Sequence, residues 1–209
     1  MLNEKKILIV GGGGLGRELY SWVNMSNSQY DVVGFLDDNT SILDGFDYPV
    51  GVVSTIQDYQ PDPGVFLVMG IMSPSAKKKV ATILTVRGAE FMTFIHDSAV
   101  IGYNNKIGYG CVITPGCILT SDTELGDMVF LNTNSTIGHD AKVGAYSSIN
   151  GKVELCGGVQ LEDECLVGSH VLVIPGKRIG ANAVLGAGSV VVGNVKAGTT
   201  VFGNPAKRI

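Results

Sequence analysis

The sequence is poor in charged and aromatic residues: 16% of its 209 residues are charged, 7% are aromatic, and one is tryptophan. Its net charge of −4 provides no basic surface of the kind that binds nucleic acid, so we expect no nucleic acid partner. No apolar run is long enough to span a bilayer, and the run at residues 7–10 is too short for a signal peptide. The sequence therefore predicts a cytoplasmic protein without membrane insertion.

An aliphatic residue recurs at every sixth position, without a break, from Ile95 to Val191. A small or β-branched residue precedes most of these by two positions, so both side chains point to one side of a short strand. A six-residue period fits neither a helix nor a continuous strand, so each hexad must be a strand plus a corner. Three hexads then form one coil of a triangular parallel β-helix, which buries its core only by stacking on its neighbours. Glycine often follows the aliphatic residue, where we expect a corner to need unusual backbone dihedral angles.

The sequence has four cysteines, and three of them occupy the small inward position of the repeat: Cys111, Cys117 and Cys165. This position predicts buried free thiols in a reducing compartment, not a disulfide framework. No spacing of cysteine and histidine is typical of a metal site, so we predict no bound metal.

The first 94 residues are typical of a small Rossmann-like α/β domain. An apolar strand over residues 5–10 leads into the glycines Gly11, Gly13, Gly14 and Gly16, and helix-like spacing follows. This is the arrangement in which backbone N–H groups and a helix dipole receive phosphate.

A second strand, over residues 32–36, ends in Asp37 and Asp38, whose carboxylates can meet a donor on a ribose or a base. Further strands are predicted over 50–53, 65–69 and 90–95, with a helix over 73–87. These units are too few for the full dinucleotide fold. We therefore expect this domain to bind a single nucleotide diphosphate that carries a sugar. The β-helix then fills residues 95–209, including a C-terminal cap.

His139 is the strongest candidate for a catalytic base. It follows Gly138 at a corner and faces out of the prism, and the equivalent place one coil later is Gly157, so the adjoining wall carries no side chain. A thioester could approach there and meet backbone N–H groups. Histidine can take the proton of an attacking amine or hydroxyl, and Asp140 could turn at the corner to orient the imidazole. The alternative is that His139 and Asp140 are solvated corner residues.

Both halves together resemble the hexapeptide-repeat sugar acetyltransferases. This family includes the sialic acid O-acetyltransferases and the N-acetyltransferases of nucleotide-linked 4-amino sugars, such as the bacillosamine-pathway enzyme. The likeness covers nearly the whole chain and rests on the segments GGGGLGREL, FLDD, IHDSAVIG, IGHDAKVG and GNPAKRI. The resemblance implies a left-handed β-helix, acetyl-CoA as donor, and a homotrimer with active sites between neighbouring prisms.

The same resemblance implies roles for particular residues. It makes His139 the base and Asp140 its partner. It assigns the glycine loop with Asp37 and Asp38 to the nucleotide of the sugar. Four further residues match positions that contact the cofactor in relatives: Asn132, Gly157, Ser169 and Ala187.

The sequence thus predicts transfer of an acetyl group from acetyl-CoA to the amino group of a nucleotide-linked 4-amino-deoxy sugar, for a surface glycan. O-acetylation of sialic acid or another sugar stays open, because one histidine can serve an amine or a hydroxyl. More remote alternatives are a nicotinamide dehydrogenase, on the strength of Gly11, Gly13, Gly16 and Asp37, and a non-catalytic trimeric scaffold or carbohydrate-binding module.

Overall fold

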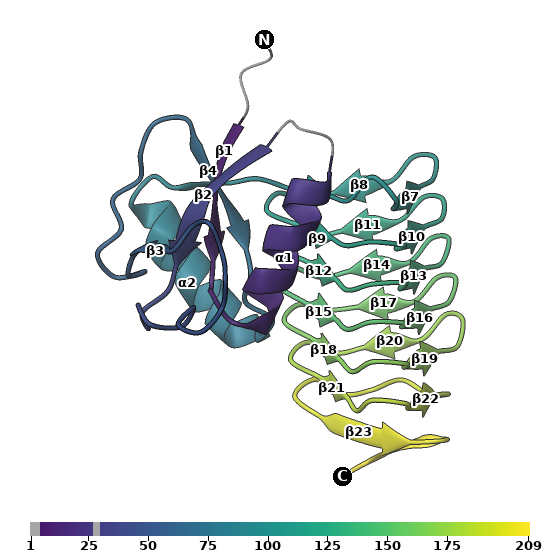
Figure 1. Cartoon of the computed structure of the whole chain (residues 1–209). Coiled ribbons are helices and arrows are strands. Elements are labelled where there is room, and N and C mark those ends of the chain that lie inside the picture. The colour runs from purple at the N-terminus through teal and green to yellow at the C-terminus, as the bar shows by residue number, and fades with distance from the viewer. Residues whose placement is uncertain (1–4, 27–29) are drawn as a thin grey trace.

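The computed structural model describes residues 5–26 and 30–209. Figure 1 shows two parts side by side: a sheet flanked by two helices, and a tall stack of short strands that ends at the C-terminus. We call them the α/β part and the β-helix. Neither helix in the described ranges is long and apolar enough to cross a membrane.

The α/β part is a five-stranded parallel sheet with the strand order β3-β2-β1-β4-β5. The glycine-rich turn lies between the first strand and the first helix, as predicted. The elements are β1 (Lys5–Val10), α1 (Gly14–Met25), β2 (Tyr30–Leu36), β3 (Val52–Ser54), β4 (Val65–Met69), α2 (Pro74–Val86) and β5 (Glu90–Phe91).

The prediction of one strand over residues 90–95 is wrong. Strand β5 pairs with β4 in the α/β part, whereas β6 (Phe94–Ile95) pairs with β9 (Val112–Ile113) in the β-helix. Apolar residues occur in both strands, at Phe91, Phe94 and Ile95, so the sequence pattern contains no signal that the pairing partner changes between them. The proposed domain boundary between residues 94 and 95 falls inside β6, and the division stays a prediction.

The β-helix has three faces, each a parallel sheet to which one coil adds one strand. The first face holds β7 (Val100–Ile101), β10 (Ile118–Leu119), β13 (Thr136–Ile137), β16 (Glu154–Leu155), β19 (Leu172–Val173) and β22 (Val190–Val191). The second holds β8 (Lys106–Ile107), β11 (Glu124–Leu125), β14 (Lys142–Val143), β17 (Gln160–Leu161) and β20 (Arg178–Ile179). The third holds β6, β9 (Val112–Ile113), β12 (Phe130–Leu131), β15 (Ser148–Ile149), β18 (Leu166–Val167) and β21 (Val184–Leu185), and closes with β23 (Thr200–Gly203) and β24 (Ala206–Arg208).

The glycines after the repeated aliphatic residues are needed for a reason other than the predicted one. Their backbones are not left-handed; the positive φ falls two residues later, for example on Asp140 at 61° and His170 at 60°. Instead, each glycine lies against the next coil. A Cβ at Gly138 would come within 2.6 Å of the Gly157 nitrogen, closer than real contacts allow. A side chain at Gly138 would therefore force these two coils apart, although the neighbouring coils hold Thr120 and Cys156 at the equivalent place.

The third face is covered by the α/β part, which lies against it in Figure 1. Its outward residues Phe94, Val112 and Phe130 join one apolar cluster with Ile7 and Leu19 of the α/β part. The repeated aliphatic residues meanwhile fill the prism axis. The three cysteines predicted to be inward are buried and free. The first and second faces are left for other contacts.

Candidate active site

His139 and Asp140 form a hydrogen-bonded pair at the corner between β13 and β14. The His139 Nδ1 atom lies 2.7 Å from Oδ2 of Asp140. The left-handed backbone of Asp140, a conformation that aspartate tolerates, brings the two consecutive side chains together. A carboxylate can only accept at this bond, so Nδ1 carries the hydrogen and Nε2 is left to accept a proton. The side chains are 73% and 68% exposed, which leaves room for substrates.

The imidazole lies directly over Gly157 of the next coil. A Cβ at position 157 would come within 2.5 Å of Nε2, so any side chain there would displace the ring. The Gly158 N–H donates to the His139 carbonyl oxygen at 2.7 Å and fixes the histidine backbone. That N–H is therefore not among the free backbone groups that we expected a thioester to meet at this corner. The Gly157 N–H has no hydrogen bond within residues 5–26 and 30–209.

The predicted cofactor residues fall on two different edges of the prism. Gly157 shares the corner between the first and second faces with His139, whereas Asn132, Ser169 and Ala187 lie at corners between the third and first faces. Ser169 and Ala187 belong to successive coils, whose corners are joined by the bond from Gly188 N–H to the Ser169 carbonyl. The whole first face separates these residues from His139. One chain alone therefore does not gather the predicted set around one cavity.

The glycines of the loop in the α/β part are needed for different reasons: Gly11 and Gly16 for backbone conformation and packing, Gly13 and Gly14 for an open surface. Gly11 has a φ of 99°, which favours glycine, and a Cβ on Gly16 would lie 1.8 Å from the Gly11 carbonyl oxygen. Gly13 and Gly14, in contrast, would project a Cβ into open space. Gly13 caps α1 with no side-chain hydrogen bond, so the first-turn N–H groups face an open surface suited to an anion.

Asp37 and Asp38 brace the loops around this surface. One Asp37 oxygen accepts the Gly12 N–H at 2.8 Å and the other accepts the Asn39 N–H at 2.9 Å. Asp38 accepts the Ile56 N–H at 2.9 Å. The sequence predicted ligand contacts for both carboxylates; the structure adds that each also holds the backbone, and that Asp37 lies against the glycine loop.

Lys77 is a residue that the sequence analysis missed. Its side chain is fully buried where α2 meets the β-helix. The signal was available, because Lys77, Ala81 and Leu84 follow the spacing of the buried stripe of a helix. A lysine within such a stripe needs a partner, and here the partner lies some seventy residues further along the chain.

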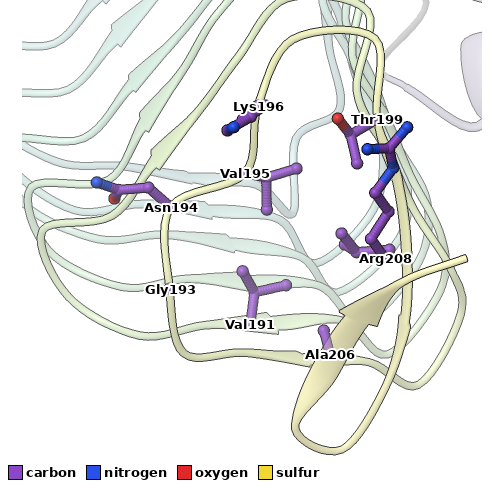
Figure 2. A pocket seen from close by; sticks show the side chains of 9 residues that line it. Val191, Gly193, Asn194, Val195, Lys196, Thr199, Ala206 and Arg208 are labelled. Carbon is purple, nitrogen blue, oxygen red and sulfur yellow. The ribbon is translucent and has the colours of Figure 1, made fainter.

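A cavity of about 290 Å³ opens at the C-terminal end of the prism. Figure 2 shows it between the last coil and the β23–β24 hairpin, with Val191 and Val195 among its lining residues. None of the predicted site residues lines it. The described residues contain no group of His, Cys, Asp and Glu that could hold a metal ion.

Comparison with known proteins finds a family model that matches the N-terminal part and relatives that are similar over nearly the whole chain. The PglD N-terminal domain matches residues 6–84. The GDP-perosamine N-acetyltransferase of Escherichia coli O157:H7 is 29% identical over 214 residues, which cover 96% of this chain and 95% of that protein.

Two solved structures extend the comparison to the whole fold. PerB from Caulobacter crescentus, in complex with CoA and GDP-perosamine, is 26% identical with a TM-score of 0.88, over 98% of this chain and 97% of that one. The acetyltransferase domain of PglB from Neisseria gonorrhoeae FA1090 is 24% identical with a TM-score of 0.88, over 99% of this chain and 100% of that one. The resemblance and the left-handed β-helix predicted from the sequence are confirmed: the chain joins a PglD N-terminal domain to a hexapeptide-repeat β-helix, the architecture of the hexapeptide-repeat sugar acetyltransferases.

Proposed function

We propose that this chain transfers the acetyl group of acetyl-CoA to the amino group of a nucleotide-linked 4-amino-deoxy sugar, for a surface glycan, in the cytoplasm. The observation that carries the proposal is the His139–Asp140 pair, whose imidazole lies over Gly157, a residue without a side chain; we call this surface the Gly157 floor. Two relatives that match nearly the whole chain support the proposal. One relative is a GDP-perosamine N-acetyltransferase, and PerB binds CoA and GDP-perosamine.

In this mechanism, the nitrogen of the sugar amine adds to the thioester carbonyl carbon while His139 Nε2 takes a proton from that amine. Asp140 stabilises the imidazolium through Nδ1. The adduct then collapses, the carbon–sulfur bond breaks, and the imidazolium returns the proton to the leaving thiolate. Such a base contributes roughly 10²–10⁴-fold to the rate. The Gly157 N–H, which forms no hydrogen bond in the described residues, is a candidate donor to the developing oxyanion.

We assign the acceptor to the α/β part, residues 1–94, and acetyl-CoA to the β-helix, residues 95–209. The open surface at Gly13 and Gly14 suits the diphosphate, because a helix N-terminus attracts negative charge. Asp37 and Asp38 then meet the nucleoside from the neighbouring strand. This division makes the two substrates separately sensitive to mutation.

We infer that the working form is a homotrimer. The support is the separation of the assigned residues: Ser169 and Ala187 lie on one edge of the prism and His139 on another. A neighbouring prism that offered its own Ser169 edge to the His139 edge would complete a site. The outward residues Val100 and Ile118 on the first face are also 58% and 39% exposed, which favours cover by a second copy.

The deciding experiment is a thiol-release assay with acetyl-CoA and a panel of UDP-, dTDP- and GDP-linked 4-amino sugars, with free sialic acid as comparator. Turnover on one nucleotide amino sugar supports the proposal and identifies the nucleotide. Turnover on sialic acid alone would make the chain an O-acetyltransferase. In the same assay, His139→Ala should lower turnover by about two orders of magnitude or more at unchanged acetyl-CoA affinity. Near-normal turnover would remove His139 as the base.

A further inference from the structure

A buried lysine connects the two parts of the chain. Lys77, on α2, has no exposed surface, and its amine crosses to β15 of the β-helix. Nζ donates to the Ser147 carbonyl oxygen at 3.0 Å and to Ser148 Oγ at 2.8 Å. Ser148 Oγ in turn donates to the Met72 carbonyl oxygen at 2.5 Å. One amine and one hydroxyl thus tie α2, the loop before it and a coil of the prism together.

This arrangement is not the expected solution for stability alone. Lys77 forms no ion pair with any acid in the described chain, so its amine is buried without a counter-ion. Burying an amine is costly even when it is hydrogen-bonded, and a well-packed apolar side chain often serves stability better. Hydrogen bonds differ from apolar packing in being directional. They fix where one part sits on the other.

The segment held by this contact borders the glycine loop. Met72 belongs to the loop between β4 and α2, two residues after Gly70. The Gly70 N–H donates to the Val10 carbonyl oxygen at 2.8 Å, and a Cβ on Gly11 would lie 3.1 Å from the Gly70 oxygen. The backbone on which Lys77 acts is therefore in contact with the proposed acceptor surface.

The other end of the contact lies close to the proposed base along the chain. Ser148 follows His139 by nine residues, and only β14 and one corner separate them. Strands of the β-helix pair with strands of the coils on both sides, as β15 does with β12 and β18, so the position of β15 relative to the His139 corner is fixed by the stacked coils. Reacting atoms must be brought to about 3–3.5 Å, and a misplacement of about 1 Å can cost a hundredfold in rate.

We propose that Lys77 is a positioning residue: through Ser147, Ser148 and Met72 it holds the acceptor-binding loops in register with His139. This proposal rests on the proposed function for its kinetic effect. Its structural effect, an ordered β4–α2 loop, does not depend on which sugar is acetylated.

The test compares Lys77→Met with Lys78→Met in the full-length protein. The first variant keeps an unbranched apolar stem and removes the buried amine. The second is the matched control, because Lys78 is the next residue of α2 and its amine crosses the same interface to Glu164 from a half-exposed position. Kinetics are measured with the amino sugar and with acetyl-CoA, and hydrogen–deuterium exchange is measured at the amides of residues 70–73.

We expect Lys77→Met to lower kcat/KM for the amino sugar by about tenfold or more while the KM for acetyl-CoA changes by less than about twofold. Exchange at residues 70–73 should quicken in Lys77→Met and not in Lys78→Met. If Lys77→Met does not fold, Ser148→Ala replaces it, since this change breaks the relay to Met72 and leaves the bond from Lys77 to Ser147. Equal kinetics and equal exchange in test and control variants would overturn the proposal, as would an equal effect on both substrates. If the wild type acetylates no nucleotide amino sugar, the proposed function fails, and the exchange comparison still decides the role of Lys77.

Discussion

The Nε2 atom of His139 lies so close to Gly157 that a single methyl group on that glycine would approach it to 2.5 Å. The histidine belongs to one coil and the glycine to the next, so the position of the proposed base is set by the stacking of the β-helix. The backbone of Gly157 is not left-handed, so it is the imidazole, and not the chain conformation, that requires glycine here.

Gly157→Ala should therefore act on catalysis through the histidine. The methyl group pushes the imidazole off its position, and we expect turnover to fall by about one to two orders of magnitude. The matched control is Gly193→Ala, which occupies the same place in the corner two coils later and meets no atom within 4 Å. Thiol release and a thermal melt are measured for both variants. Equal turnover in the two would contradict the role of the Gly157 floor.

Asp140→Asn tests the charge of the pair without disturbing the backbone. Asparagine tolerates left-handed φ, and the chain itself uses it at the equivalent corner position in Asn104, Asn134 and Asn182. The melting temperature should thus stay unchanged, while kcat falls by about ten- to a hundredfold because the imidazolium loses its carboxylate. Asp122→Asn, one coil earlier at the same position, is the control and should keep full activity. A normal rate in Asp140→Asn would mean that Asp140 only shapes the corner.

Two glycines of the N-terminal loop should separate binding from folding. Gly16→Ala forces a methyl group against the Gly11 carbonyl oxygen and should destabilise the α/β part. Gly13→Ala meets open space, so the fold should persist while the KM for the nucleotide sugar rises by about tenfold, because the methyl group would occupy the proposed diphosphate surface. Thermal melts and initial rates distinguish the two effects. An unchanged KM for the nucleotide sugar in Gly13→Ala would mean that the nucleotide binds at another place.

Asp37→Ala should raise the KM for the nucleotide sugar far more than the KM for acetyl-CoA. The change removes a carboxylate beside the proposed acceptor surface and also frees the Gly12 N–H that this carboxylate binds. Both effects concern the α/β part alone. Initial rates with each substrate varied in turn provide the measurement, and equal effects on the two KM values would refute the division of substrates between the parts.

Lys77 should make stability depend on pH near neutrality. Burial lowers the pKa of its amine to about 7, whereas an unfolded lysine titrates near 10.5. Between these values the unfolded chain binds more protons at this residue than the folded chain, so the contribution of Lys77 to stability rises with pH, by at most about 1.4 kcal/mol per pH unit.

The measurement is the free energy of unfolding of the wild type and of Lys77→Met between about pH 7 and about pH 8.5. The wild type should gain stability relative to the variant across this range. Cys111 is the titratable group that faces Lys77, and burial raises the pKa of its thiol to about 11, so it stays protonated in the folded protein throughout. A constant difference between the two proteins would contradict the lowered pKa of Lys77.

The period of six was sufficient to predict most of the β-helix core, because residues such as Leu131 and Val173 are buried as the repeat requires. The period was less informative for the first coil of the stack. Ile101 is 38% exposed, because β7 is the edge strand of its sheet and no preceding coil covers it. A repeat pattern describes the average coil and contains no signal for its own first member.

The site was predictable only where the signal is local. The proximity of His139 and Gly157 follows from counting one coil along the sequence, and the fold has that spacing. The partners of Lys77 lie in another part of the fold, and no count within one repeat leads from α2 to β15. Ser169 and Ala187 likewise lie on a different edge of the prism from His139, and the proposed completion of a site by a second copy of the chain cannot be deduced from a count along one chain.

The pairing of each coil with the next has a consequence for how such a chain can change its acceptor. Ser148 pairs with Leu166 one coil further along, so inserting or deleting a coil shifts everything beyond it by one strand spacing, about 4.8 Å. That step is several times the misplacement of about 1 Å that can already cost a hundredfold in rate. The distance between the proposed acceptor loops and His139 can thus change only in steps of a whole coil, and we expect a different sugar to be accommodated by substitutions at fixed positions.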